Sequence, residues 1–144
     1  MRQEDKELLL KDLGARLSYG VKISVNDKVE ILQGIDISDN VVSYDSFLSS
    51  DIEEIKPYLF PISSVSEDQA KELFDLFGIS MSDSMEMDYI KINECTGITF
   101  FLNRGFDVET HLDKLIDWLN AHHFDYRYLI EKGLAIDASN LNIY

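Results

Sequence analysis

The sequence predicts an α+β fold, with a mostly antiparallel sheet of about five strands and three to four helices packed on one face. Segments with apolar residues at helical spacing alternate with segments in which every second residue is apolar. Turn-forming glycine, asparagine and aspartate separate these segments. Their order is helix, three strands, helix, two strands and two helices, which requires no parallel crossover. The alternative is a small barrel built from the first strands, with the helices appended.

The first third of the chain contains a helix and a meander. Residues 3–17 are predicted to be helical, because leucines recur at three- and four-residue steps among charged residues. Residues 21–25 alternate apolar and polar side chains, as in a half-buried strand. After a turn at Asn26-Asp27, we expect a second strand that continues through residues 29–37 with a bulge at its glycine. Residues 41–44 then form the third strand.

The middle of the chain has two capping signals. Residues 50–53 read as a capping box that opens a short helix. We expect residues 57–65 to be an irregular connector, because they contain both prolines of the chain. Ser66 begins a second capping box, and the helix that follows should end at Gly78.

The next segment is predicted to contain a hairpin and the longest helix. A methionine-rich loop at residues 79–87 precedes two expected strands, residues 90–92 and 98–102. Asp107 is the predicted N-cap of an amphipathic helix that includes Trp118. Trp118 lies beside the apolar stripe of this helix, so we expect it to be a core residue.

At the C-terminus, Asp125 is expected to cap a short helix that Gly133 ends in a Schellman motif. About residues 135–144 should form a flexible surface tail. A chain of 144 residues has the usual size of one domain, so residues 1–144 are expected to form a single globular domain. No stretch approaches the ~20 apolar residues of a membrane span, and we expect a cytoplasmic protein.

The net charge of −14 is the strongest functional signal in the sequence. Fifteen acidic and three basic residues lie between positions 29 and 94. Such acidity disfavours direct binding to nucleic acid and favours a basic protein partner. The sequence therefore predicts a non-enzymatic accessory or interaction protein that binds through its acidic middle. The candidate interaction surface consists of Asp36, Asp39, Asp45, Asp51, Glu53 and Glu54. No lysine or arginine lies among them, so we expect these carboxylates to be solvated and to contribute little to stability.

A second candidate is the polar segment His122, His123, Asp125 and Arg127. His111 precedes His122 by about three helical turns, some 16 Å, which is too far for one metal ion. The chain has no His-Glu-x-x-His motif, no calcium loop and no glycine-rich phosphate loop. We therefore expect no catalytic residue, metal or cofactor. Two alternatives stay open: a nucleic-acid mimic that inhibits a basic partner, and an enzyme or metal-binding protein that uses this segment.

Three segments carry a resemblance to a known family. They are EDKELLLKDL at residues 4–13, IKPYLFPISS at 55–64 and DWLNAHHFDYR at 117–127. Together they resemble a family of short uncharacterised proteins abundant in anaerobic gut bacteria, including their phages and mobile elements. The resemblance implies a bacterial setting and a mobile-element origin. It implies no activity, cofactor or functional residue.

Overall fold

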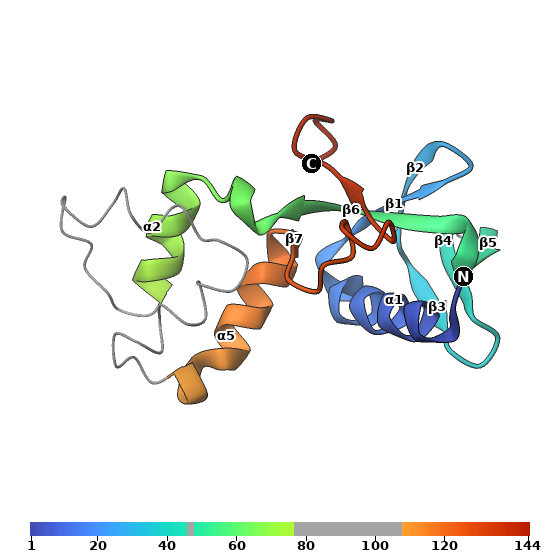
Figure 1. The fold of residues 1–144 in the computed structure, drawn as a ribbon, viewed down its shortest axis with the longest axis horizontal. Helices are drawn as coiled ribbons and strands as arrows, with labels where there is room; N and C mark the ends of the chain where they lie inside the picture. The colour runs from blue at the N-terminus through green and yellow to red at the C-terminus, as the bar shows by residue number, and fades with distance from the viewer. Residues whose placement is uncertain (46–47, 77–107) are drawn as a thin grey trace. The chain divides into compact units, whose positions relative to one another are not determined.

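The computed structural model describes residues 1–45, 48–76 and 108–144, and the side chains of 74 and 108–112 are not described (Figure 1). The chain divides into two compact units. Unit 1 comprises Met1–Phe60 and Arg127–Tyr144, and unit 2 comprises Pro61–Tyr126. The structure has a mixed five-stranded sheet, a separate three-stranded sheet and three described α-helices. The α+β class is therefore confirmed, whereas the single domain over residues 1–144 stays a prediction.

Unit 1 begins with helix α1, Gln3–Arg16, which confirms the predicted N-terminal helix. Its last turn tightens into the 3-10 helix η1, Leu17–Tyr19, and Gly20 ends it in the left-handed region at φ 66°. Leu9 and Leu13 are fully buried, as the leucine spacing predicts. One face of α1 therefore contributes to the core, while its first turn carries acidic residues.

Strands β1, Lys22–Val25, and β2, Lys28–Ile31, form the predicted hairpin. Asn26 and Asp27 have φ values of 50° and 62°, as the two central residues of a type I′ turn require. This two-residue turn fixes the register, with Val25 opposite Lys28 and Ser24 opposite Val29. Val29 therefore shares the outer face of the hairpin with Ser24, and it is exposed.

The second strand does not continue through residues 29–37, so that prediction was wrong. After β2 the chain enters a second antiparallel sheet of β3, Gly34–Asp36, β4, Val41–Asp45, and β5, Leu48–Asp51. Gly34 lies opposite Ser43, and a Cβ atom at Gly34 would stand 2.5 Å from the Ser43 Oγ atom. The glycine therefore permits a close approach between two strands and does not mark a bulge.

The irregular connector expected at residues 57–65 is largely strand β6, Ile55–Pro61. It follows the 3-10 helix η2, Ile52–Glu54, and pairs antiparallel with β1. Pro57 lies opposite Ile23, which already pairs with Glu30 of β2. The backbone groups of Ile23 thus face β2, and the missing N–H of Pro57 removes no bond to β1. The prolines were therefore misleading evidence against a strand.

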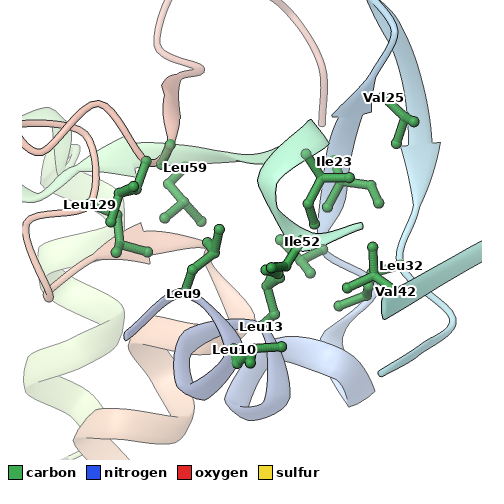
Figure 2. Packing of buried hydrophobic residues seen from close by; sticks show 14 residues of the cluster. Leu9, Leu10, Leu13, Ile23, Val25, Leu32, Val42, Ile52, Leu59 and Leu129 are labelled. Carbon is green, nitrogen blue, oxygen red and sulfur yellow. The ribbon is translucent and has the colours of Figure 1, made fainter. Parts of the chain in front are cut away.

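The core of unit 1 lies between α1 and the strands. Figure 2 shows leucines of α1 directed toward side chains from β1, β4, η2 and β6. The buried residues of this cluster that Figure 2 labels are Leu9, Leu10, Leu13, Ile23, Val25, Leu32, Val42, Ile52, Leu59 and Leu129. They come from both ends of the chain, so unit 1 is complete only when residues 127–144 return to it.

The short helix expected after Asp125 is absent. Phe124–Asp125 form the two-residue strand β7, residues 126–127 form a bend, and residues 129–133 form a turn. The predicted stop signal is nevertheless confirmed: Gly133 has φ 71°, and the Leu134 N–H donates to the Leu129 carbonyl at 2.8 Å. The Gly133 N–H donates to the Ile130 carbonyl, which completes the Schellman pattern. The Schellman motif thus ends one turn of the backbone and not the predicted helix.

The last residues are built into unit 1 and do not form the expected surface tail. Strand β8, Ile136–Asp137, pairs in parallel with β6, and Ala138 is buried. The Tyr144 hydroxyl accepts a hydrogen bond from the Lys22 N–H and donates one to the Tyr58 carbonyl, both at 2.9 Å. It completes the rung of the β1–β6 ladder that follows the Ile23–Pro57 pair.

This hydroxyl makes unit 1 sensitive to alkaline pH. Tyr144 as a whole residue is 41% exposed, but burial around its hydroxyl raises the pKa to about 12 from 10.0. A raised folded-state pKa contributes stability that is present below about pH 10 and is lost as pH rises through about 12. We expect urea stability to fall across this interval, and Tyr144→Phe to remove the part of the fall that this residue causes. An equal slope in the variant would contradict this assignment.

Unit 2 contains the predicted capping box at Ser66. The Gln69 N–H donates to the Ser66 hydroxyl at 3.2 Å, and the Ser66 N–H donates to the Gln69 side-chain carbonyl at 2.9 Å. Helix α2, Glu67–Leu76, follows, and the 3-10 helix η3, Ile62–Ser64, precedes it. Helix α5, Val108–Ala121, confirms the predicted long helix. The elements expected at residues 79–102, together with Gly78 and Asp107, lie outside the described residues.

Candidate functional site

Five of the six predicted acidic residues lie at or next to one end of the three-stranded sheet. Asp36 lies opposite Val41, and Val41 lies opposite Asp51, so the two carboxylates flank one residue on the same face. Asp39 lies in the turn between β3 and β4, and Glu53 and Glu54 follow Asp51 in η2. Asp45 is at the opposite end of β4, about 13 Å along the strand from Val41. The predicted surface is therefore one acidic end and one separate carboxylate.

Several of these carboxylates are structural, which corrects the expectation that all are simply solvated. Asp36 accepts hydrogen bonds from the Ser38 N–H, the Ser38 hydroxyl and the Asp39 N–H, and these bonds lower its pKa. Asp51 accepts from the Glu53 N–H at 2.9 Å and caps η2. The turn thus uses the side chain of Asp36, and not that of Asp39.

Glu53 is bound by cations from the N-terminal segment. It forms an ion pair with the Lys6 ammonium, and the terminal ammonium of Met1 lies 3.6 Å away. The hydrogen bond that the Lys6 ammonium donates to Glu53 lowers the pKa of Glu53 and raises the pKa of Lys6. The acidic middle therefore has a basic partner within its own chain, which local sequence could not reveal.

An acidic hollow opens beside this end of unit 1. It has a volume of about 530 Å³. Its lining residues are Ser24, Asn26, Asp27, Glu53, Glu54, Lys56 and Ile136. They come from the β1–β2 hairpin, η2, β6 and β8, so the hollow depends on the return of the C-terminal segment. We refer to these seven residues as the acidic hollow.

The charges of the acidic hollow differ in how far they are neutralised. Asp27, Glu54 and Lys56 form no ion pair with another residue in the described part of the chain, whereas Glu53 is engaged by Lys6. Asp27 and Glu54 can therefore accept hydrogen bonds from a lysine or arginine of another molecule. Sequence reasoning identified Glu53 and Glu54. It missed Asp27, which was read as turn chemistry alone, and it missed Lys56.

The four residues of the second candidate site divide between the two units, with Arg127 in unit 1 and the other three in unit 2. The His122 imidazole lies 3.1 Å from a carboxylate oxygen of Glu72 on α2, and its ring contacts that of Trp118 at a tilt of 40°. His123 is buried and has φ 59°, as expected for the residue that ends a helix. Asp125 is buried in β7 of unit 2. The second candidate site stays a prediction.

Arg127 belongs to unit 1, where it binds Asp12. Its guanidinium Nη1 lies 3.1 Å from Asp12 Oδ1, and Asp12 also pairs with Arg16 four residues along α1. Asp12 and Arg16 are completely buried. Among the described residues, no group of three or more histidine, cysteine, aspartate or glutamate side chains could hold a metal ion. We describe Asp12, Arg16 and Arg127 below as the buried ion triad.

Comparison with protein-family models, curated proteins and solved structures finds no match. Within residues 1–45, 48–76 and 108–144, no helix has the length and apolar character needed to cross a membrane. The site must therefore be interpreted from its own geometry, and the resemblance described above stays a prediction.

Proposed function

We propose that this chain is a non-enzymatic accessory protein that binds a basic protein partner through the acidic end of unit 1. The observation that carries the proposal is the acidic hollow, in which Asp27 and Glu54 form no ion pair with a described residue while the neighbouring Glu53 is neutralised by Lys6. The same end of unit 1 displays Asp39, which is exposed and forms no ion pair with a described residue. Such a surface attracts lysine and arginine side chains.

The position of the charges supports binding over a purely structural role. Asp36, Asp51 and Glu53 have roles inside unit 1, and these roles use the acceptor capacity of three of the six predicted carboxylates. Asp27, Asp39 and Glu54 have no such role in the described contacts. The proposal includes a bacterial cytoplasmic setting and a mobile-element origin, which the sequence resemblance suggests.

Neutralising the three carboxylates without a structural role should weaken binding of a basic ligand. We expect a variant with Asp27→Asn, Asp39→Asn and Glu54→Gln to bind a lysine- and arginine-rich peptide about tenfold more weakly, since each exposed ion pair contributes roughly 0.2–1 kcal/mol. Asparagine suits the positive φ of position 27, so the hairpin should be preserved. Isothermal titration at low and physiological salt measures the change.

The control removes the same amount of charge elsewhere. Asp75, Asp113 and Asp117 are exposed on α2 and α5 of unit 2, and their replacement by asparagine changes the net charge equally. We expect this control variant to retain most of the affinity. Equal losses in both variants would show that only net charge matters. A different outcome would favour the nucleic-acid mimic. In that case only a domain that binds duplex DNA displaces the bound peptide, and that domain releases its DNA when it binds the chain.

A further inference from the structure

Among the strands that the structure describes, β2 is at the edge of its sheet, with β1 as its neighbour. In a hairpin with a two-residue turn, the residues that flank the turn form a hydrogen-bonded pair, and such pairs then alternate with non-bonded ones. Val25 and Lys28 flank the turn, so Ile23 and Glu30 form the next bonded pair. The backbone N–H and C=O groups of Val29 and Ile31 must therefore point away from β1, toward the free edge.

Two hydrogen bonds confirm this alternation. The Leu32 N–H donates to the Val21 carbonyl at 3.0 Å, two residues beyond the Ile23–Glu30 pair. The Lys22 N–H points the other way and donates to the Tyr144 hydroxyl. The next donor on the open edge after Ile31 is the Gln33 N–H, and it binds the Ser43 carbonyl at 2.8 Å. Within the described part of the chain, the open part of this edge is thus confined to β2.

The side chains at this edge are also exposed. Val29 is 46% and Ile31 is 50% exposed, and neither forms a hydrogen bond outside its sheet with any described residue. Figure 1 shows the β1–β2 hairpin projecting from the rest of unit 1. Val29, Ser24 and Lys56 are directly opposite one another across three strands, and Ser24 and Lys56 line the acidic hollow. The edge and the acidic hollow are therefore continuous.

Charge decides which strand can pair with β2. An antiparallel second copy that used both Val29 and Ile31 would pair Val29 with Ile31 and place Glu30 opposite Glu30. Like charges opposite one another on neighbouring strands are destabilising, and each copy carries a net charge of −14. A strand with a basic residue opposite Glu30 meets neither obstacle. Self-pairing is therefore disfavoured, and pairing with a basic partner is favoured.

We propose that β2 is a docking edge for an extended segment of a basic partner. The incoming segment adds a strand to the sheet, with a lysine or arginine opposite Glu30 and apolar residues opposite Val29 and Ile31. Its backbone uses the outward N–H and C=O groups of β2, and its further basic residues reach Asp27 and Glu54 in the acidic hollow. The basic character of the partner rests on the proposed function, whereas the mode of docking rests on the free edge.

The test uses the full chain and a synthetic peptide of alternating valine and lysine that ends in a run of lysines, so that basic residues beyond the paired strand can reach Asp27 and Glu54. In the free protein, the amide protons of Val29 and Ile31 should exchange quickly and that of Glu30 slowly. Bound peptide should slow exchange at Val29 and Ile31 by at least about tenfold, since both amides gain hydrogen bonds. The same peptide with N-methylated backbone amides keeps its charges but cannot pair, and we expect it to give no such protection.

Variants separate the edge from the surface charge. Glu30→Lys should weaken binding of the alternating peptide about fivefold or more, because it places lysine opposite lysine. Glu7→Lys makes the same change of charge on α1 and should have little effect on binding. If the N-methylated peptide binds equally well and Val29 stays unprotected, the docking edge is wrong and the proposed function stands. If Val29 and Ile31 are protected but the triple neutralisation has no effect, the edge stands and the acidic-surface proposal fails. If the amides of Val29 and Ile31 are already protected from exchange without peptide, and the protein forms a dimer, self-pairing replaces the inference.

Discussion

Asp12→Ala should be among the most destabilising single substitutions in unit 1, with a loss of about 3–5 kcal/mol in the free energy of unfolding. Asp12 receives two hydrogen bonds from Arg16, at 2.8 and 3.1 Å, and one from Arg127 at 3.1 Å. Arg16 is completely buried, so removal of the carboxylate leaves a guanidinium without its counter-charge in the core. Urea unfolding followed by circular dichroism measures the loss.

A double variant tests whether charge burial causes this loss. Asp12→Leu combined with Arg16→Met replaces the fully buried pair by apolar side chains, and Arg127, which is partly exposed, can turn toward solvent. We expect the double variant to recover most of the stability, because a buried ion pair contributes little compared with well-packed apolar groups. A loss as large as that of Asp12→Ala would mean instead that the shape of the pair is what the core requires.

Trp118→Ala should cost unit 2 about 3–5 kcal/mol, the usual range for truncating a buried large aromatic side chain. Trp118 is 6% exposed, which confirms the prediction that it is a core residue. Its ring stacks on Phe124 with centroids 5.4 Å apart and contacts His122 at 4.4 Å. Its indole N–H has no acceptor among the described residues, so packing is the main contribution of the side chain.

Trp118→Phe is the matched control, because it keeps an aromatic ring and loses only the indole N–H and part of the volume. We expect it to cost far less than the alanine variant, and His122→Ala to cost little because His122 is partly exposed. Since the chain has one tryptophan, its fluorescence reports on unit 2 in the unmodified protein. Circular dichroism is needed for the variants. Equal losses for alanine and phenylalanine would contradict a packing role.

Local signals in the sequence were sufficient for elements whose causes are local. The leucine spacing of α1, the turn at Asn26-Asp27 and the capping box at Ser66 each depend on residues within a few positions. The Schellman stop at Gly133 was also correct, although the helix before it was not. These signals specify backbone angles and hydrogen bonds over one turn of chain, and they need no knowledge of tertiary contacts.

The errors arose where a distant segment determines the outcome. Strand β6 was missed because its prolines count against a strand until the bonding direction of Ile23 is known. The tail was misread because β8 and Tyr144 are held by β1 and β6. The candidate surface was incomplete for the same reason, since Lys6 neutralises Glu53 from α1 and Asp27 joins the acidic hollow through the hairpin.

The return of residues 127–144 to the first sixty residues has a consequence for synthesis of the chain. Tyr144 and Lys22 are 122 positions apart, so the β1–β6 ladder cannot be completed on the ribosome until the whole of unit 2 has been translated. During that interval the edges of β1 and β6 lack their last partner. The entropy of closing a loop grows only with the logarithm of its length. Additional residues between Pro61 and Tyr126 should therefore delay completion of unit 1 during synthesis far more than they reduce its stability.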